Sequence, residues 1–362
     1  MNKRNYINGE ELCFSLKKLY ESFGYVQFKM SKFEEYSVYL DNKNFLKSPY
    51  AITFTDLNGK LMALKPDVTL SIVKNTKATA DADQKVYYRE SVYRPDKTTK
   101  EFKEISQMGL EFIGKIDDYA TAEILLLAAK SLEAIDGDFV LDVSHLGVLT
   151  GLLQEYNAQT YAAEIYAFIS SKNTHDLIDF CNRKNIDQTF AKKVATLAGA
   201  KGNFRQVLEV AKKVATSKES ANAVSALETI FNALQNIGFD DKIRLDFSIV
   251  NDGDYYNGIV FQGYVGSSAY TVLTGGRYDK LAGKFVNGVS AMGFAVYLDE
   301  LPLGEVSDGF DGDALVLYGA DTDVAKVLKT VQKYAEQGKK VCAAKSVPQN
   351  KNFKTSVNLQ EK

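Results

Sequence analysis

The chain has 362 residues, of which 45% are hydrophobic and 12% aromatic, enough to form packed cores in roughly two or three domains. The formal net charge is −2 and no segment carries a sustained basic run, so the composition argues against a nucleic-acid partner. We expect a cytoplasmic protein without a signal peptide, because the N-terminus lacks an apolar core and no stretch reaches the length of a membrane span. The three cysteines are far apart in the sequence, which predicts no disulfides. With only two histidines, we also expect no metal and no cofactor.

The first part of the chain is predicted to alternate helices with antiparallel strands. Residues 10–23 place apolar side chains at helical spacing. The segment 50–66 is typical of a hairpin with an Asn-Gly turn, and Asp67 follows at the start of a helix. The next elements are expected in this order: two strands joined by a charged loop over 86–114, a helix over 117–135 and a strand over 138–147.

The rest of the chain divides into three parts. Leucine and alanine recur at spacings of three and four over 148–236, which predicts an all-helical insertion. Alternating patterns then return the chain to antiparallel strands, and a strand-helix-strand unit after Gly309 ends in a polar tail that we expect to be disordered. The predicted domains are a discontinuous sheet-bearing domain of residues 1–147 and 237–308, the insertion 148–236, and a short α/β unit 309–362.

The strand sequence QMGLEFIG, residues 107–114, has two chemically different faces. Alternation separates an apolar face from a polar one, with Met108, Leu110 and Phe112 on the first and Gln107, Gly109 and Glu111 on the second. One interpretation is an antiparallel sheet whose polar side faces solvent. The other is a binding site in which the glycine leaves room for a ligand beside an amide and a carboxylate.

Two other segments favour the binding site. Asp67 and Thr69 stand at the start of a predicted helix. Tyr255 and Tyr256 are adjacent and precede a strand. Carboxylates suit an ammonium group, hydroxyl and amide groups orient a ligand, and Glu111 with a tyrosine suits a ring N–H. Together these groups favour recognition of an amino acid, if the fold brings the segments together.

The segment TGGRYDKLAGKF, residues 274–285, is not a phosphate-binding P-loop. Six residues separate Gly276 from Gly283, and Phe285 follows Lys284, whereas a P-loop has four residues between its glycines and Ser or Thr after the lysine. The adjacent glycines Gly275 and Gly276 predict a tight bend between a strand and a helix.

The order of these motifs resembles the catalytic domain of histidyl-tRNA synthetases. The motifs are LMALKPDVT, YRPD, ISQMGLE, DYYNGIVF, LTGGRYDKL and AMGFAVYLDEL, over roughly residues 10–305 outside the helical insertion. The resemblance implies an α+β fold of the class II aminoacyl-tRNA synthetase type, with an antiparallel sheet, flanking helices, a helical insertion and a short C-terminal α/β unit. Positions of that family's histidine pocket, together with an arginine that contacts the ATP α-phosphate, match the candidate histidine-binding residues Asp67, Thr69, Arg94, Gln107, Glu111, Tyr255, Tyr256 and Tyr278.

Two positions depart from the synthetase pattern. Asn251 stands where the resemblance places a catalytic arginine, and Glu300 where it places the arginine that clamps the ATP triphosphate. Loss of one such donor typically costs about 3 kcal/mol of transition-state stabilisation, and a carboxylate repels the phosphates. Residues 310–362 supply only part of an anticodon-binding domain and are expected to carry no basic face. The departures imply that neither ATP nor tRNA is bound.

A synthetase-like chain that keeps a histidine pocket and loses these functions resembles the regulatory subunits of ATP phosphoribosyltransferase. The resemblance implies a non-catalytic protein that activates a short-form catalytic transferase, binds histidine as feedback effector and forms a homodimer within a hetero-oligomer, with no nucleic-acid or membrane partner. Two alternatives stay open. One is a divergent histidyl-tRNA synthetase, and the other is a paralogue that binds a different amino acid for a different partner.

Overall fold

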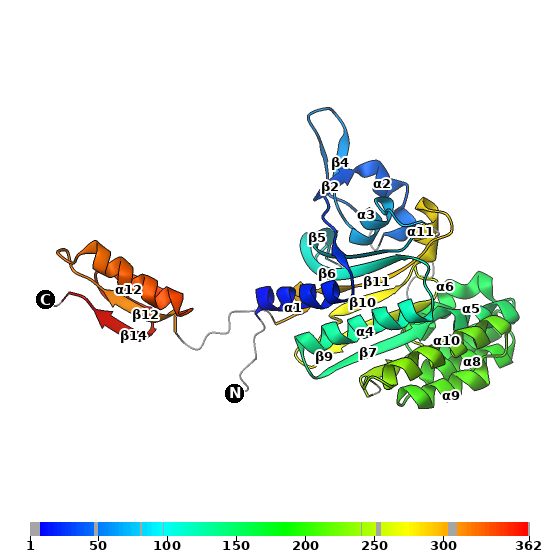
Figure 1. The fold of residues 1–362 in the computed structure, drawn as a ribbon. Helices are drawn as coiled ribbons and strands as arrows, with labels where there is room; N and C mark the ends of the chain where they lie inside the picture. Colours follow the sequence, from blue (N-terminus) through cyan, green and yellow to red (C-terminus); the bar gives the residue numbers. More distant parts are fainter. Residues whose placement is uncertain are drawn as a thin grey trace. The chain divides into compact units, whose positions relative to one another are not determined.

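The computed structural model describes residues 8–46, 50–79, 82–96, 98–239, 241–250, 255–302 and 310–360. The chain forms two compact units, residues 1–303 and residues 304–362. Figure 1 shows a large sheet with helices on both of its faces in the first unit, and a smaller sheet carrying helix α12 in the second.

A mixed, mostly antiparallel sheet organises the first unit. Its eight strands within the described ranges are, from edge to edge, β1 (Val26–Gln27), β5 (Gln84–Pro95), β6 (Phe102–Gly114), β11 (Ser290–Tyr297), β10 (Leu273–Arg277), β9 (Ile259–Val265), β7 (Phe139–His145) and β8 (Ile243–Leu245). The pairs β1–β5 and β7–β8 are parallel and the others antiparallel. The antiparallel strand pair predicted within 86–114 is confirmed, since β5 and β6 pair along their whole length.

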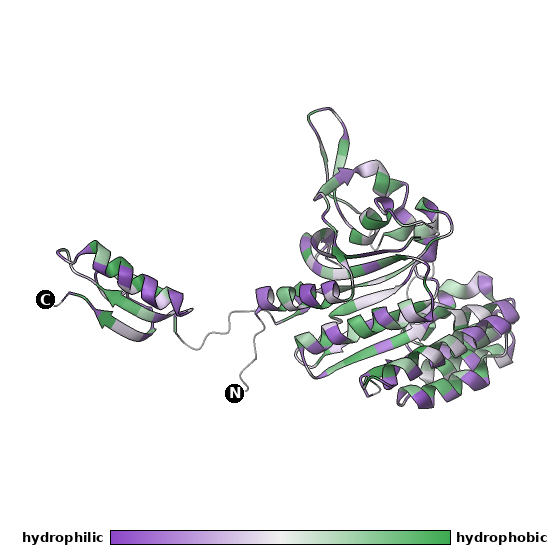
Figure 2. Ribbon diagram, in the orientation of Figure 1, coloured by the Kyte–Doolittle hydropathy of each residue, from purple (hydrophilic) through white to green (hydrophobic). Residues whose placement is uncertain are grey.

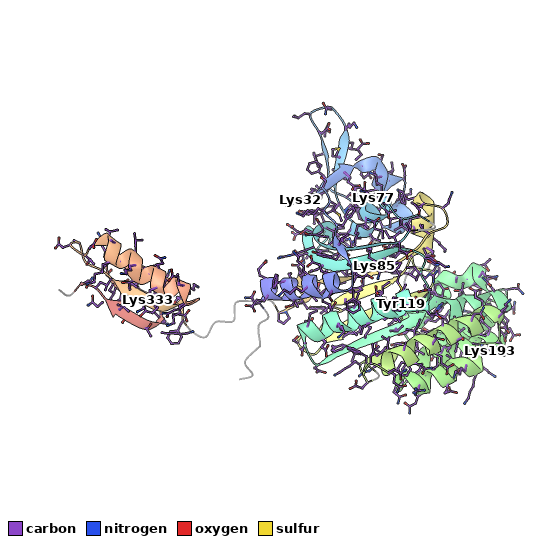
Figure 3. All side chains as sticks on the ribbon, in the orientation of Figure 1. Lys32, Lys77, Lys85, Tyr119, Lys193 and Lys333 are labelled. Atoms are coloured by element: carbon purple, nitrogen blue, oxygen red, sulfur yellow. The ribbon has the colours of Figure 1, made fainter. Side chains whose placement is uncertain are left out.

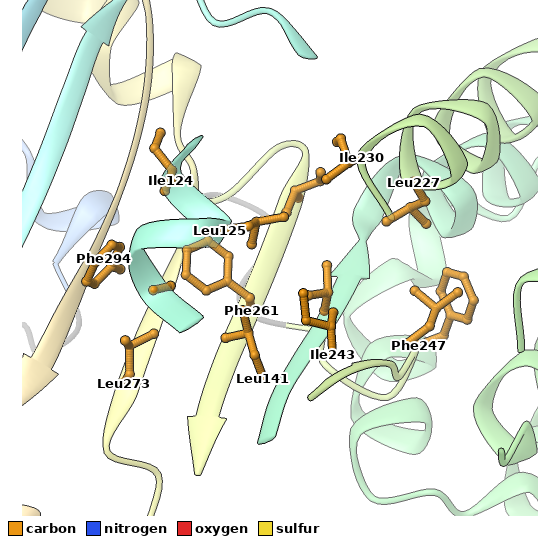
Figure 4. Packing of buried hydrophobic residues seen from close by; sticks show 14 of the residues in the cluster. Ile124, Leu125, Leu141, Leu227, Ile230, Ile243, Phe247, Phe261, Leu273 and Phe294 are labelled. Carbon is orange, nitrogen blue, oxygen red and sulfur yellow. The ribbon is translucent and has the colours of Figure 1, made fainter. Parts of the chain in front are cut away.

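Helices α1 (Gly9–Ser22) and α4 (Asp118–Ile135) cover one face of this sheet. Asn8 caps the start of α1, and Asp117 accepts the Ala120 N–H at the start of α4. The apolar stripe of α4 joins the strands in one buried cluster, in which Figure 4 shows Ile124, Leu125 and Phe261. Burial of this stripe between helix and sheet is the main stabilising contribution on this side.

Short elements cover the opposite face. They are β2 (Phe33–Glu35), α2 (Tyr36–Leu40), the 3₁₀ turn η1 (Lys43–Phe45), β3 (Thr53–Thr55), β4 (Leu61–Leu64), α3 (Val68–Lys74) and α11 (Asp279–Phe285). The strands β3 and β4 form the hairpin predicted over 50–66, and α3 starts directly after Asp67 as predicted. Val68 and Ile72 of α3 pack in one cluster with Tyr88 and Ile113 of the sheet. Residues 107–114 are therefore buried on both faces, and the interpretation with a solvent-exposed polar side is wrong.

Helices fill the segment between β7 and β8. They are α5 (Leu146–Glu155), the 3₁₀ turn η2 (Gln159–Tyr161), α6 (Ala162–Ser170), α7 (Thr174–Arg183), α8 (Gln188–Gly199), α9 (Phe204–Val214) and α10 (Lys218–Gln235). Helix α10 packs against α5 and α4, and the rings of Phe204 and Phe231 stack with centroids 4.0 Å apart. Figure 2 shows the alternation of hydrophobic and hydrophilic residues that makes these helices amphipathic.

The second unit is a three-stranded parallel sheet with one helix among the residues described there. Its elements are β12 (Gly312–Leu317), α12 (Val324–Glu336), β13 (Val341–Ala344) and β14 (Phe353–Asn358), with β12 in the middle of the sheet. The expectation of a disordered polar tail is wrong for residues 353–358, because β14 pairs with β12 from Gly312↔Phe353 to Leu317↔Asn358. Backbone hydrogen bonds at a sheet edge do not require apolar side chains.

The exposed side of α12 corrects a second expectation for this unit. Lys326, Lys329 and Lys333 lie three and four residues apart and are all exposed, so they follow one side of the helix. Figure 3 labels Lys333. The expectation that the unit carries no basic face is therefore wrong. Within the described ranges, no helix combines the length and the apolar character that crossing a membrane requires.

Candidate functional site

The eight residues that the sequence predicted for the site line a single cavity. The cavity lies where α3 begins, against β5, β6, β10 and β11, and its volume of about 30 Å³ is the room for roughly one water molecule. Its lining comprises the predicted residues Asp67, Thr69, Arg94, Gln107, Glu111, Tyr255, Tyr256 and Tyr278 and six further residues, Val68, Tyr88, Thr274, Gly293, Phe294 and Ala295. The fold thus brings together segments that lie far apart in the sequence.

Asp67 connects the start of α3 to strand β5. Its Oδ1 accepts the backbone N–H of Leu70 at 2.9 Å, which caps the helix. Its Oδ2 accepts a hydrogen bond from Arg94 Nη2 at 3.0 Å, and Arg94 Nε donates to the carbonyl of Pro66 at 2.5 Å. The side chains of Arg94 and Asp67 are only 11% and 4% exposed, so loss of either would leave a buried charge without its partner.

Glu111 is the carboxylate at the centre of the cavity wall, and it is 2% exposed. It accepts a hydrogen bond from Thr69 Oγ1 at 2.8 Å and another from the hydroxyl of Tyr278. Burial, followed by the charge of Glu111, raises the pKa of Tyr278 well above its ordinary value, so this hydroxyl stays a donor. Two carboxylates and the single guanidinium of Arg94 give the lining a net charge of −1, which favours a ligand with an ammonium group.

Tyr255 and Tyr256 form the aromatic side of the cavity. Their ring centroids are 4.6 Å apart in an edge-to-face arrangement, and Tyr255 lies 5.9 Å from the ring of Tyr278. Burial raises the pKa of Tyr255 well above its ordinary value, and the neighbouring Asp67 carboxylate adds to the effect. The tyrosine hydroxyls therefore remain neutral hydrogen-bonding groups at any physiological pH.

Gln107 and Tyr88 contribute polar groups from β6 and β5. Gln107 is 4% exposed, and its amide makes no hydrogen bond to any residue in the described ranges, so it is available to a ligand. Tyr88 was missed by the sequence reasoning, although it is 1% exposed and lines the cavity. A usable signal was present, because Tyr88 lies an even number of residues before Arg94 in one strand and hence on the same face.

The glycines of β10 have a different role from the one predicted. Gly275 and Gly276 lie inside the strand, and the helix begins only at Asp279, so the prediction of a tight bend is wrong. A Cβ at Gly276 would lie 2.6 Å from the ring of Tyr256, and one at Gly275 would lie 2.4 Å from the ring of Phe261. The glycines are needed because aromatic rings pack directly on the strand backbone.

The two acidic residues after β11 lie outside the cavity lining. Asp299 and Glu300 belong to the 3₁₀ turn η3 (Leu298–Glu300), and both are exposed. Asp299 Oδ2 accepts the backbone N–H of Ser106 at 2.6 Å, so it joins the turn to β6. Glu300 lies near Lys103, whose pKa it helps to raise, although the main cause is a hydrogen bond to Asp96. Asn251, the other predicted departure from the synthetases, lies outside the described residues.

Two further clusters bear on metal or ligand binding. An open groove of about 600 Å³ lies between α5 and the start of α10, with His145 in its wall. Burial, and then the charge of Arg277, lowers the pKa of His145 to about 4, so the imidazole is neutral at pH 7. Among the described residues, one group of three possible metal ligands is found on α7, namely His175, Asp176 and Asp179, and all three are exposed.

Comparison with known proteins defines the class. The family model for histidyl-tRNA synthetase matches residues 4–301. A crystal structure of an ATP phosphoribosyltransferase regulatory subunit/histidyl-tRNA synthetase from Bacillus halodurans C superposes with a TM-score of 0.84, covering 98% of this chain and 94% of that one at 20% identity. The protein is thus a histidyl-tRNA synthetase-like protein, and the predicted α+β fold of the class II synthetase type is confirmed.

Similarity to a relative of known class identifies the family within the histidyl-tRNA synthetase-like proteins. The ATP phosphoribosyltransferase regulatory subunit of Desulfitobacterium hafniense (strain Y51) is 31% identical over 294 residues, which cover 79% of this chain and 75% of the relative. The chain belongs to the family of ATP phosphoribosyltransferase regulatory subunits. A solved ATP phosphoribosyl transferase (HisG:HisZ) complex from Thermotoga maritima contains a chain of the same fold, with a TM-score of 0.64, 20% identity and coverage of 82% of this chain and 98% of that one.

Proposed function

We propose that this protein is a non-catalytic regulatory subunit that binds histidine in the cavity at the start of α3 and controls a short-form ATP phosphoribosyltransferase. The observation that carries the proposal is the convergence of all eight predicted residues on that cavity, in a chain of the regulatory-subunit family. The relative from Thermotoga maritima is described as part of a complex with a transferase, which supports a hetero-oligomer here too. Within that complex we propose a homodimer of this chain.

The chemistry of the lining suits histidine. The net negative charge from Asp67, Arg94 and Glu111 attracts the ammonium group of an amino acid. Glu111 accepts hydrogen bonds, so it suits the ring N–H of a neutral imidazole, and the Gln107 amide offers both a donor and an acceptor. The whole lining is uncharged or anionic apart from the paired Arg94, so a free phosphate is disfavoured.

Binding requires the cavity to open, because its volume of about 30 Å³ admits roughly one water molecule and not an amino acid. Tyr255 is the least buried of the tyrosines in the lining. We propose that its ring moves when histidine enters. A ligand that selects an opened form in this way shifts an equilibrium of the subunit, which is the physical basis for feedback on a partner.

The absence of catalysis is part of the proposal. Amino-acid activation places developing negative charge on phosphate, and fixed cations stabilise it. In this chain the position matched to the triphosphate-clamping arginine is the exposed carboxylate Glu300. The three cysteines are free thiols, in keeping with the cytoplasm as the proposed place of action.

Reconstitution with a short-form transferase tests the proposal. The expected result is co-purification of the two chains, an increase in phosphoribosyl-ATP formation on mixing, and reversal of that increase by histidine. A matched pair of variants assigns the effect to the cavity. Glu111→Gln should abolish the response to histidine, whereas Glu133→Gln, an exposed carboxylate on α4, should preserve it. Unchanged transferase activity on mixing would contradict the proposal.

A divergent histidyl-tRNA synthetase is the second candidate, favoured by the match of the synthetase family model and by the retained Arg94. Histidine-dependent exchange of pyrophosphate into ATP by the purified chain distinguishes the two candidates. Exchange above the background of the same reaction without histidine would establish catalysis and overturn the non-catalytic proposal. Calorimetry against the other amino acids tests the remaining alternative, a paralogue for a different ligand.

A further inference from the structure

Lys65 is a fully buried lysine that does not line the cavity. It is 0% exposed, and its Nζ donates a hydrogen bond to Glu90 Oε2 at 2.6 Å. The side chain of Glu90 is 18% exposed, so the pair lies inside the protein on one side and near the surface on the other. Lysines are almost never fully buried, because removing the ammonium from water costs several kcal/mol. A packed apolar side chain at position 65 avoids that cost, so the ion pair calls for a reason other than stability.

The position of Glu90 in the sheet supplies a reason. Glu90 lies on β5 between Tyr88 and Arg94, at even spacing from both, and those two residues line the cavity. Its direct partner across the strands is Gln107. Side chains at such paired positions have Cβ atoms about 5 Å apart and interact. The Glu90 carboxylate is thus the acceptor that β5 places directly opposite Gln107.

The Gln107 amide nevertheless makes no hydrogen bond to Glu90 or to any other residue that the structure describes. The carboxylate of Glu90 is instead bound by Lys65, two residues before Asp67 at the start of α3. The backbone on both sides of this contact is fixed, because the Tyr93 N–H donates to the Lys65 carbonyl at 3.0 Å and Arg94 Nε donates to the Pro66 carbonyl. The hydrogen bond from Lys65 therefore anchors the Glu90 carboxylate to the segment that leads into α3.

We propose that Lys65 is a positioning residue for the ligand, acting through Glu90. It holds the Glu90 carboxylate away from Gln107 and so keeps the Gln107 amide free to bind an amino acid. This inference rests on the proposed binding of histidine in the cavity. It assigns to the Lys65–Glu90 pair a role in ligand affinity and explains why the charged pair is kept beside a site whose own lining does not include it.

Two double variants that differ by one functional group test the inference. Both carry Lys65→Met, which removes the ammonium and fills its space. One adds Glu90→Leu, which removes the acceptor, and the other adds Glu90→Gln, which keeps a carbonyl oxygen at the same place. Replacing both members of a buried ion pair by well-packed uncharged side chains is often neutral for stability, so both variants are expected to have a single cooperative melting transition close to that of the unaltered chain.

Two measurements are made on each variant. The first follows the side-chain amide signals of Gln107 in ligand-free, nitrogen-15-glutamine-labelled protein, assigned by their loss in Gln107→Ala. The second is the histidine dissociation constant by calorimetry, well below the melting temperature. The Leu variant should keep the original Gln107 signals and an affinity within about threefold of the unaltered chain. The Gln variant should show shifted signals with slower hydrogen exchange and an affinity weaker by about tenfold, as expected when one hydrogen bond competes with the ligand.

The outcomes separate this inference from the proposed function. Equal Gln107 signals in the two variants would overturn the positioning role, as would equal dissociation constants. A Leu variant that fails to fold would overturn it as well, since the pair would then be needed for stability. If the unaltered chain does not bind histidine, the proposed function fails, while the Gln107 signals still decide whether Lys65 keeps that amide free.

Discussion

Substitution of Gly293 by alanine is the most direct test of how the cavity is built. Gly293 of β11 pairs with Glu111 of β6. A Cβ at this glycine would lie 1.8 Å from Glu111 Oε2 and 2.3 Å from the Leu110 carbonyl oxygen. The carboxylate is able to rotate away, but only by giving up its hydrogen bonds from Thr69 and Tyr278. The carbonyl belongs to the β6 backbone, so the two strands must also separate.

These contacts set the expected magnitude. Overpacking in a well-packed interior costs about 1–3 kcal/mol. Each lost hydrogen bond to a charged group adds about 1.5–3 kcal/mol. We expect Gly293→Ala to lower the free energy of unfolding by at least about 3 kcal/mol, which is a fall of roughly 6 °C or more in the melting temperature of a unit of this size. Histidine affinity should fall by about a hundredfold or more, because Glu111 no longer faces the ligand.

The matched control is Gly283→Ala. Gly283 lies in helix α11, and a Cβ there would meet no atom within 4 Å. Alanine is favoured over glycine in a helix by about 1 kcal/mol, so this variant should be as stable as the unaltered chain or slightly more stable. Thermal denaturation and calorimetry on the two variants check the prediction. A Gly293→Ala protein within about 2 °C and threefold in affinity of the control would refute the reasoning.

Three further predictions concern charged and titrating groups. Arg94→Met should destabilise the protein by about 3–5 kcal/mol, because it leaves the buried Asp67 carboxylate without its cationic partner. Arg89→Met on the same strand removes only an exposed ion pair with Glu10 and should cost less than about 1 kcal/mol. Urea denaturation of the two variants measures this difference in the free energy of unfolding. Tyr278→Phe removes a donor to Glu111 and should weaken histidine binding by about tenfold or more, with Tyr270→Phe, an exposed tyrosine, unchanged in calorimetry. Burial and the charge of Arg277 lower the pKa of His145 to about 4, whereas its pKa in the unfolded chain is about 6.5. Between these two pH values the unfolded chain binds more protons than the folded chain. The contribution of His145 to stability is therefore complete above pH 6.5 and is lost as the pH falls toward 4. His145→Asn, which keeps a helix cap at α5, should flatten the melting temperature over that range, and an unchanged slope would argue against the assignment.

Local patterns in the sequence were sufficient for the elements that carry the site. The Asn-Gly turn predicted the hairpin β3–β4, since Gly59 adopts a φ of +80° that favours glycine. The cap at Asp67 predicted the start of α3. Alternation in β6 separated Gln107 and Glu111 from the apolar face. Each of these signals depends on residues that are neighbours in the chain, so it can be recognised without knowledge of the fold.

The rest depended on contacts between distant segments. The polar side of β6 is buried because α3 and α11 pack over it, and no pattern within 107–114 specifies that cover. Gly276 looked like a turn residue because the ring that occupies its missing side-chain space, Tyr256, is twenty residues earlier. Strand β14 is polar along most of its length and is ordered by pairing with β12, which its own composition does not reveal.

Three of the four strands beside the cavity, β6, β10 and β11, share a surface made partly of bare backbone. Gly109, Gly276 and Gly293 each have a neighbouring ring, carbonyl or carboxylate within 3 Å of where a Cβ would stand. Bare backbone of this kind is a constraint on evolutionary change, because any side chain at these positions would collide with the ring, carbonyl or carboxylate that packs there. New ligand preferences in this family should therefore arise at lining positions that have side chains to exchange, such as Tyr88 and Thr274, while these three glycines stay the same.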